Sequence, residues 1–246
     1  MMRRLAVLAL AALFATPARA ALPVPRRITD ARLDYVAYSH GLAILHFRVI
    51  LALWPGGYRM RLAYRTSGVV GFFYRGHQLD AVAGTWKDGR PAPRLYRADG
   101  VWHGGVHRLR LIYRDGVPHV AEVLPPISKE RHPVPKADQR GTVDTLTAVV
   151  DLLRRLAGGR SCDDSVRTFD GRRLGVIAAR EAGSTRLART GRSIFAGAAR
   201  RCDFTGRMLA GFLYGHRARD SRPLHGSAWF ARLAPGGPRL PVHLRF

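Results

Sequence analysis

Alternation of apolar and polar positions is the clearest pattern in the N-terminal half of the chain. From Ala43 to Leu53 every second residue is apolar, and Tyr58 to Thr66 alternates aromatic or aliphatic residues with arginine or alanine. A period of two predicts β-strands with one buried face. By the same reading we expect strands at 32–39, 42–53, 58–66, 77–87, 93–98, 106–114 and 117–124.

Turn residues separate several of these segments. Asp88-Gly89, Asp99-Gly100 and Asp115-Gly116 each have the composition of a type I′ hairpin, in which both central residues adopt positive φ. Three such pairs in a short stretch predict an antiparallel meander over 32–124.

One helix is expected in the second half. Residues 125–141 are rich in proline and charge and are typical of an exposed connector. Apolar residues then follow helical spacing over 143–157, with Thr142 or Asp144 as N-cap and Gly158-Gly159 at the end. An amphipathic helix can also bind a membrane surface or a partner, but we favour packing on a sheet.

The rest of the chain returns to short strands. Segments 166–169, 172–179, 194–204, 226–233 and 239–246 read as strands within a C-terminal region, 160–246. The predicted fold class is mainly β, a curved antiparallel sheet packed on one principal helix. We expect a single domain over 21–246.

The first twenty residues have the layout of a secretory signal peptide. Arg3 and Arg4 precede an apolar run, and Ala18-Arg19-Ala20 is a cleavage signal, so we expect cleavage after Ala20 and a periplasmic protein. The apolar run is short for a membrane span, although an uncleaved anchor stays open. No later stretch predicts a transmembrane span in the mature chain.

Cysteine usage agrees with export. The chain has two cysteines, Cys162 and Cys202, and an even count in an exported protein predicts a disulfide. A redox or metal-binding pair is the alternative, but neither cysteine lies in a C-x-x-C motif.

The chain is strongly basic, with 41 Lys and Arg against 17 Asp and Glu and a net charge of +24. Such an excess indicates a polyanionic partner. For an exported protein we expect lipid headgroups, lipopolysaccharide phosphates or another anionic envelope component rather than nucleic acid. Drift in composition toward arginine is the competing explanation.

Motifs for chemistry are weak. There is no nucleophile elbow, phosphate loop, dinucleotide fingerprint or zinc-protease motif. His103 and His107 flank glycines, which predicts a turn rather than a metal site, and Asp163-Asp164 read as turn acids. We therefore predict no catalytic residues, no metal and no cofactor.

An aromatic set is the best candidate for ligand binding. Its members are Trp54, Phe72, Phe73 and Tyr74, the last three lying among glycines. They could form a rim over an apolar cavity, and ordinary core packing is the alternative.

A family resemblance follows from several short segments in order. They are the strand pair around Gly41, the strand from Tyr58 into 66–71, the stretch 141–148, Cys162 followed by 169–173, and Trp229 with Pro241-Val242. In these the chain resembles domain-of-unknown-function family 3108, a group of exported bacterial β-rich proteins. The resemblance implies a fold similar to periplasmic lipoprotein carriers, a curved sheet wrapped around helix, and no assigned chemistry.

These observations favour a non-catalytic periplasmic protein that binds an apolar or anionic amphipathic ligand of the envelope. An envelope hydrolase or polysaccharide-modifying enzyme, and an interaction module without a cavity, are the alternatives. The sequence does not predict the oligomeric state.

Overall fold

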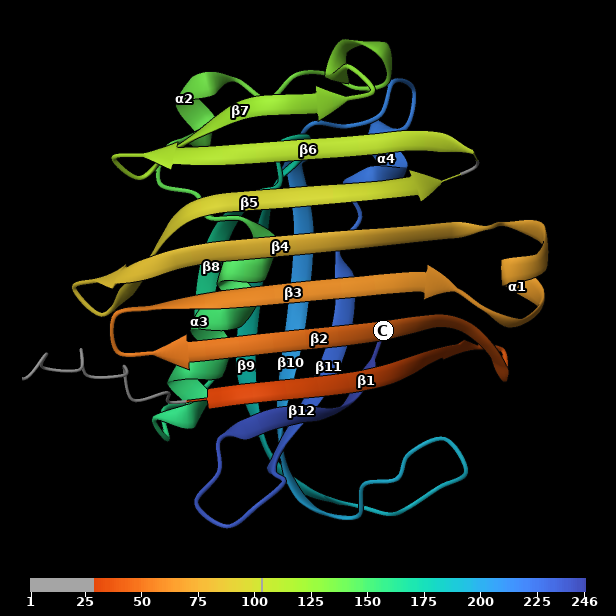
Figure 1. Cartoon of the computed structure of the whole chain (residues 1–246), viewed down its shortest axis with the longest axis vertical. Helices are drawn as coiled ribbons and strands as arrows, with labels where there is room; N and C mark the ends of the chain where they lie inside the picture. Colours follow the sequence, from red (N-terminus) through yellow and green to blue (C-terminus); the bar gives the residue numbers. More distant parts are fainter. Residues whose placement is uncertain (1–28, 103) are drawn as a thin grey trace, which may run out of the picture.

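The computed structural model describes residues 29–102 and 104–246. The predicted signal peptide and His103 lie outside the described residues. The chain forms two antiparallel sheets, with the strands of the second running across those of the first (Figure 1). Such a crossing arrangement places the core between the inner faces of the two sheets.

The first sheet is a seven-stranded meander in which each strand pairs with the next along the chain. Its strands are β1 (Thr29–Ser39), β2 (Leu42–Trp54), β3 (Gly57–Thr66), β4 (Gly76–Lys87), β5 (Arg90–Trp102), β6 (Gly105–Arg114) and β7 (Val117–Leu124). In the register, Phe47 of β2 lies opposite Tyr64 of β3, and Tyr64 lies opposite Gln78 of β4. The same face of each strand therefore points to the second sheet.

The second sheet has five strands in the order β12-β11-β10-β9-β8. They are β8 (Asp164–Phe169), β9 (Leu174–Leu187), β10 (Gly197–Ala210), β11 (Leu224–Arg232) and β12 (Arg239–Arg245). The edge strands β1 and β12 are joined where the Tyr35 hydroxyl donates to the carbonyl of Pro241 at 2.7 Å.

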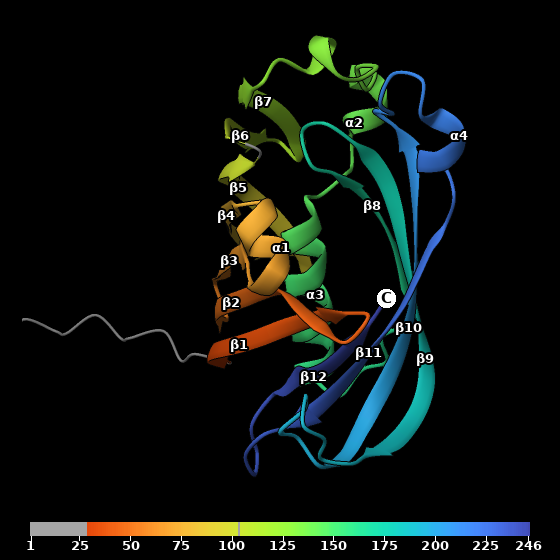
Figure 2. The ribbon, with the colours of Figure 1, turned by 90° about the vertical axis from the view of Figure 1, so that its right-hand side faces the viewer.

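Helices are short apart from one. The short ones are α1 (Gly68–Phe73), the 3-10 turn η1 (Ile127–Lys129), α2 (Lys136–Gln139) and α4 (Arg217–Asp220). The long helix α3 (Thr145–Ala157) lies between the two layers (Figure 2). No helix among the described residues is long and apolar enough to span a membrane.

Helix α3 is fixed to the first sheet by a buried polar chain. Asp144 is the N-cap and accepts from the backbone N–H of Thr147 at 2.8 Å and from its hydroxyl at 2.7 Å. The Thr147 hydroxyl also lies 3.2 Å from the Tyr58 hydroxyl on β3. Burial raises the pKa of the Asp144 carboxyl to about 6, against which its hydrogen bonds with Thr147 act.

The apolar core surrounds this helix. It is built from buried side chains of α3 and of both sheets, among them Leu146, Val150, Leu153, Leu156, Leu51, Leu53, Met60, Val82, Leu111, Phe169 and Phe230. Burying the apolar stripe of a helix between two sheet faces is the main stabilising contribution of such an arrangement.

The predicted fold class is confirmed: the chain is mainly β with a helix packed on a sheet. The strands form two sheets, a division that the sequence does not predict. Asp88-Gly89 and Asp115-Gly116 form the expected turns, with positive φ at all four residues. The prediction of a turn at Asp99-Gly100 is wrong, because both residues lie inside β5 and the chain turns at Gly104 instead.

The predicted disulfide is confirmed as a Cys162–Cys202 bond. It joins the segment after α3 to β10, and both cysteines are fully buried. It therefore ties the C-terminal end of the central helix to the second sheet.

Candidate ligand-binding cleft

Helix α3 covers only part of the inner face of the first sheet. Along β2, Leu51 and Leu53 are buried, whereas Phe47 is only partly buried. Along β3, Tyr58 and Met60 are buried but Tyr64 is not. The inner face therefore changes from fully buried to partly exposed along each strand.

Three aromatic rings form a row across the partly exposed part of this face. Phe47 and Tyr64 have ring centroids 5.7 Å apart, and Tyr64 and Trp102 are also separated by 5.7 Å. Both distances lie within the range of favourable aromatic pairs. We call Phe47, Tyr64 and Trp102 the aromatic row.

The position of Trp102 depends on Gly76 and Gln78. A Cβ at Gly76 would lie 2.3 Å from the indole ring, so only glycine lets the ring rest on β4. The indole N–H donates to the Gln78 side-chain oxygen at 2.9 Å. Gln78 in turn donates from its amide nitrogen to Asp80 at 2.6 Å.

Asp80 is a buried carboxyl beside the aromatic row. Burial raises its pKa to about 6, helped by the nearby charge of Asp170 and opposed by the Gln78 hydrogen bond. Tyr64 has its pKa raised to about 12 by burial and by Asp80, while Arg173 acts in the opposite direction. Asp80, Tyr64 and Arg173 therefore lie close enough to influence one another electrostatically.

The second sheet contributes a cavity of about 260 Å³. Its lining includes Thr145 of α3, Ile177 of β9 and Met208 of β10. Gly206 also lines it, and a Cβ built there meets no heavy atom within 4 Å. The absence of a side chain at Gly206 therefore leaves space in the cavity beside β10.

Three arginines lie at this cavity. Arg173 is bound to Asp170 through its Nε and Nη2 at 2.8 and 2.7 Å, and this neighbouring carboxylate raises the Arg173 pKa. Arg207 and Arg222 form no ion pair or side-chain hydrogen bond with any described residue. Arg207 and Arg222 are both exposed, and Arg207 lies on the opposite face of β10 from Gly206 and Met208.

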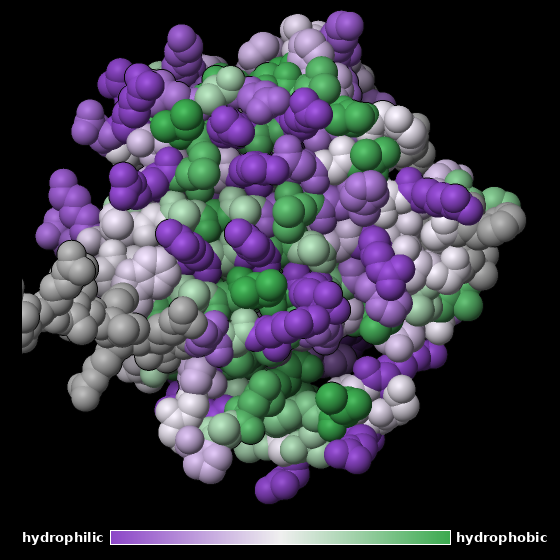
Figure 3. Space-filling model, in the orientation of Figure 1, coloured by the Kyte–Doolittle hydropathy of each residue, from purple (hydrophilic) through white to green (hydrophobic). Residues whose placement is uncertain are grey.

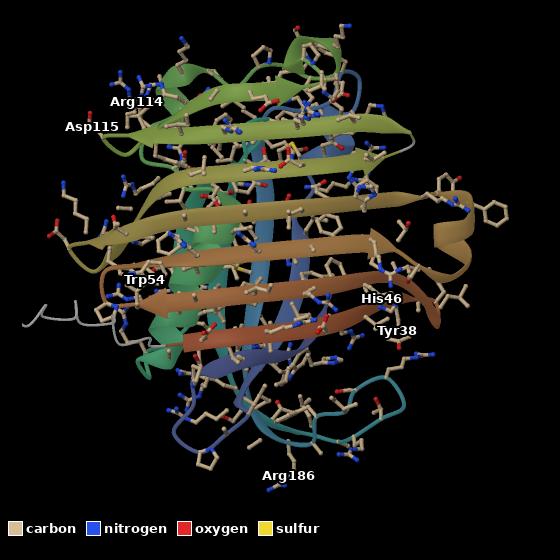
Figure 4. The ribbon with its side chains drawn as sticks, in the orientation of Figure 1. Tyr38, His46, Trp54, Arg114, Asp115 and Arg186 are labelled. Carbon is tan, nitrogen blue, oxygen red and sulfur yellow. A yellow bond between two sulfur atoms is a disulfide. The ribbon has the colours of Figure 1, made fainter. Side chains whose placement is uncertain are left out.

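The four residues predicted as a rim do not form one site. Trp54 lies at one end of the first sheet (Figure 4), and α1, which contains Phe73, lies at the other end (Figure 1). Phe73 and Tyr74 are 69% and 59% exposed, so ordinary core packing does not describe them. Phe72 belongs to α1, and its side chain is not described.

The acids and cysteines considered for chemistry have structural partners. Asp163 accepts from the backbone of Glu181 at 2.8 Å, and Asp164 pairs with Arg155 at 3.0 Å. Cys162 and Cys202 lie near Glu181, but their sulfurs are bonded to each other and the Glu181 carboxylate pairs with Arg200. These groups are used to hold the segment after α3 on the second sheet.

Sequence reasoning missed the aromatic row and the cavity arginines. Period-two alternation places Phe47 and Tyr64 on the inner face, which was a usable signal. Nothing in one strand tells which inner residues α3 will cover. The cavity arginines, Arg207 and Arg222, follow no local motif.

Comparisons with known proteins give a distant neighbour. No protein-family model matches the chain, and no curated protein matches it. The chain is similar to the crystal structure of a beta-barrel-like protein of the domain of unknown function DUF1849 from Brucella abortus. The identity is 14%, the TM-score is 0.47, and the match covers 89% of this chain and 98% of the other. The resemblance to family 3108 stays a prediction.

Proposed function

We propose that this chain is an exported, non-catalytic binding protein that holds an amphipathic anionic ligand in the cleft between its two sheets. The proposal is supported by the partly exposed aromatic row and by a cavity whose lining residue Arg173 influences Tyr64 electrostatically and which Arg207 and Arg222 also line. Ligand sites are typically mostly apolar with a few convergent polar groups. The aromatic row and the arginine-lined cavity would together supply both kinds of group.

The apolar part of the ligand is assigned to the aromatic row. Phe47, Tyr64 and Trp102 give up exposed ring surface when an alkyl chain covers them, and each buried methylene contributes about 0.8 kcal/mol. The partly exposed side chains of Ile177 and Met208 extend the apolar surface on the second sheet.

The anionic part is assigned to the arginines. A guanidinium can hold a carboxylate or phosphate through two parallel hydrogen bonds, and Arg207 and Arg222 have no described carboxylate to displace. The cavity of about 260 Å³ is slightly below the roughly 300–1,000 Å³ of drug-sized sites. It suits a headgroup or a short chain, with the remainder of the ligand along the aromatic row.

Catalysis is the less favoured function. Asp80 has the raised pKa expected of a general acid, but its side-chain partner is Gln78, and Asp170 is held by Arg173. Ser39 and His40 share a hydrogen bond at an exposed turn, where they are adjacent in sequence. None of these pairs brings a nucleophile to a base inside the cleft.

A titration with matched amphiphiles tests the proposal. Dodecanoate and dodecanol share an alkyl chain and differ in headgroup charge, and binding is followed by Trp fluorescence and calorimetry. We expect dodecanoate to bind more tightly, and Arg207→Ser with Arg222→Ser to remove the preference, a loss of about tenfold. Arg189→Ser, on an exposed loop, is the control. Equal binding of both amphiphiles by all variants contradicts the anionic headgroup, and no binding of either contradicts the cleft.

A further inference from the structure

The outer face of the first sheet carries an unusual charge pattern at its centre. The outward positions of β2, β3 and β4 are His46, Arg48, Ile50, Ala52, Arg59, Arg61, Ala63, Arg65, His77, Leu79, Ala81 and Ala83. This set contains four arginines and no acidic residue. The acids on this face, Asp30, Asp34, Asp99 and Glu122, lie on β1, β5 and β7.

The arginines of β3 stand between small or apolar neighbours. Arg61 lies opposite Ile50 on one side and Ala81 on the other, and Arg59 lies opposite Ala52 and Ala83. Arg59 and Arg61 are exposed, and neither pairs with a carboxylate among the described residues. Like charges at this spacing repel one another, which a bound polyanion would relieve.

Arginines on the neighbouring strands have acidic partners. Arg97 of β5 pairs with Asp99, and Arg108 of β6 lies 3.9 Å from Glu122 of β7. Arg48 near the β1 edge pairs with Asp34 at 2.7 Å. The excess positive charge is therefore concentrated on the middle of the face rather than spread evenly.

Apolar side chains are exposed within the same surface. Ile50 is 43% and Leu79 40% exposed, and Leu95 of β5 is 38% exposed. Figure 3 shows hydrophobic residues interleaved with hydrophilic ones over this face. The alanines at 52, 63, 81 and 83 have short side chains, so the arginines project beyond the surface around them.

We propose that this arginine-rich outer face binds the surface of an anionic phospholipid bilayer. Arginines meet lipid phosphates, while the exposed aliphatic side chains enter the boundary between headgroups and acyl chains. A soluble polyanion would satisfy the arginines and leave Ile50 and Leu79 in water. The mixture of charge and aliphatic surface therefore favours a bilayer over a soluble polyanion. This surface is on the opposite side of the sheet from the cleft, so the two proposals are independent.

Vesicle co-sedimentation tests the surface. The purified mature chain is mixed with phosphatidylcholine vesicles with or without phosphatidylglycerol, at low and physiological salt. We expect partition into the anionic vesicles and little into the neutral ones. Arg59→Ser with Arg61→Ser should weaken partition by roughly 30-fold, since each arginine near an anionic surface contributes about fivefold.

The matched control removes the same charge elsewhere. Arg186 and Arg189 are exposed, and Arg186 lies away from the first sheet (Figure 4). Arg186→Ser with Arg189→Ser should change partition by less than threefold or so. Arg59→Lys with Arg61→Lys should retain most of the binding, and circular dichroism checks that each variant is folded.

Three outcomes would overturn the proposal. The first is an equal loss of vesicle partition in the two double serine variants. The second is the absence of binding to anionic vesicles by the wild-type chain. The third is an unchanged partition of Leu79→Ser together with full competition by inorganic polyphosphate. The first would mean that only net charge matters, and the last would identify a soluble polyanion as the partner.

Discussion

The indole of Trp102 rests on Gly76, where a Cβ would approach the ring to 2.3 Å. The close approach places Trp102 within the aromatic row, tilted by 38° to the Tyr64 ring, and its N–H donates to the Gln78 side chain. Trp102 is thus held by a backbone contact on one side and by a hydrogen bond at its edge.

Replacing Gly76 with alanine should displace Trp102. We expect Gly76→Ala to lower the free energy of unfolding by about 1–3 kcal/mol, because the new methyl group overpacks the ring. It should also shift the Trp fluorescence and weaken amphiphile binding. Gly191→Ala is the control, since a Cβ there meets no heavy atom within 4 Å. Equal stability of the two variants by denaturant unfolding would refute the packing argument.

Neutralising Asp80 should stabilise the protein above pH 6. Its pKa is about 6 in the folded chain and near 3.8 when unfolded, so the folded state holds the proton more tightly. Its contribution to stability is therefore present below about pH 4 and is lost as pH rises through 6. We expect Asp80→Asn to be about 3 kcal/mol more stable than wild type at pH 7.5, and similar to it at pH 4.

The pH dependence needs a control because Asp144 has a raised pKa of the same sign. Asp80→Asn should remove only part of the slope of stability against pH between 4 and 7. Asp115→Asn changes an exposed turn residue and should leave the slope as it is in wild type (Figure 4). A wild-type slope in Asp80→Asn would mean that burial does not perturb this carboxyl.

Removing the cap of α3 should be costly. Asp144→Ala leaves the buried N–H and hydroxyl of Thr147 without their acceptor, and we expect a loss of about 3 kcal/mol of stability. Asp144→Asn retains a side-chain acceptor for the cap and should lose less. The two are compared by urea unfolding, and an alanine variant as stable as the asparagine variant would contradict the assigned role of the cap.

The disulfide should contribute through chain entropy. It closes a loop between residues 40 apart in sequence, so Cys162→Ser with Cys202→Ser should cost about 4 kcal/mol. Reducing agent should destabilise the wild type and leave the double variant unchanged, as measured by thermal unfolding. A small effect of both treatments would show that Leu153 and Leu156 hold α3 on the sheets without the bond.

The strands were predictable because the pattern that defines them is local. Alternation in 42–53 and 58–66 predicts which residues share a face, and Asp88-Gly89 predicts a turn. Neither prediction depends on the rest of the chain. Asp99-Gly100 has the same composition and failed because pairing with β4 and β6 extends β5 past it to Trp102. Tertiary pairing overrode a local preference there.

The cleft was not predictable for a related reason. Phe47 and Leu51 have the same apolar character and lie on the same face of β2, yet only Leu51 is fully buried. The difference is set by where α3 lies, and that depends on long-range contacts such as Tyr58 with Thr147. The division into two sheets rests equally on long-range contacts, including Tyr35 with Pro241.

The central claim, a ligand between the sheets, is tested most directly by filling the space at Gly206. Organic extracts of the protein, purified from its native cells without detergent, are analysed by mass spectrometry for wild type, Gly206→Leu and the exposed-loop control Gly191→Leu. We predict a stoichiometric anionic amphiphile in the wild type and the control, and its loss from Gly206→Leu with the fold intact. A clean extract from folded wild type, or the same ligand in all three, would contradict the account.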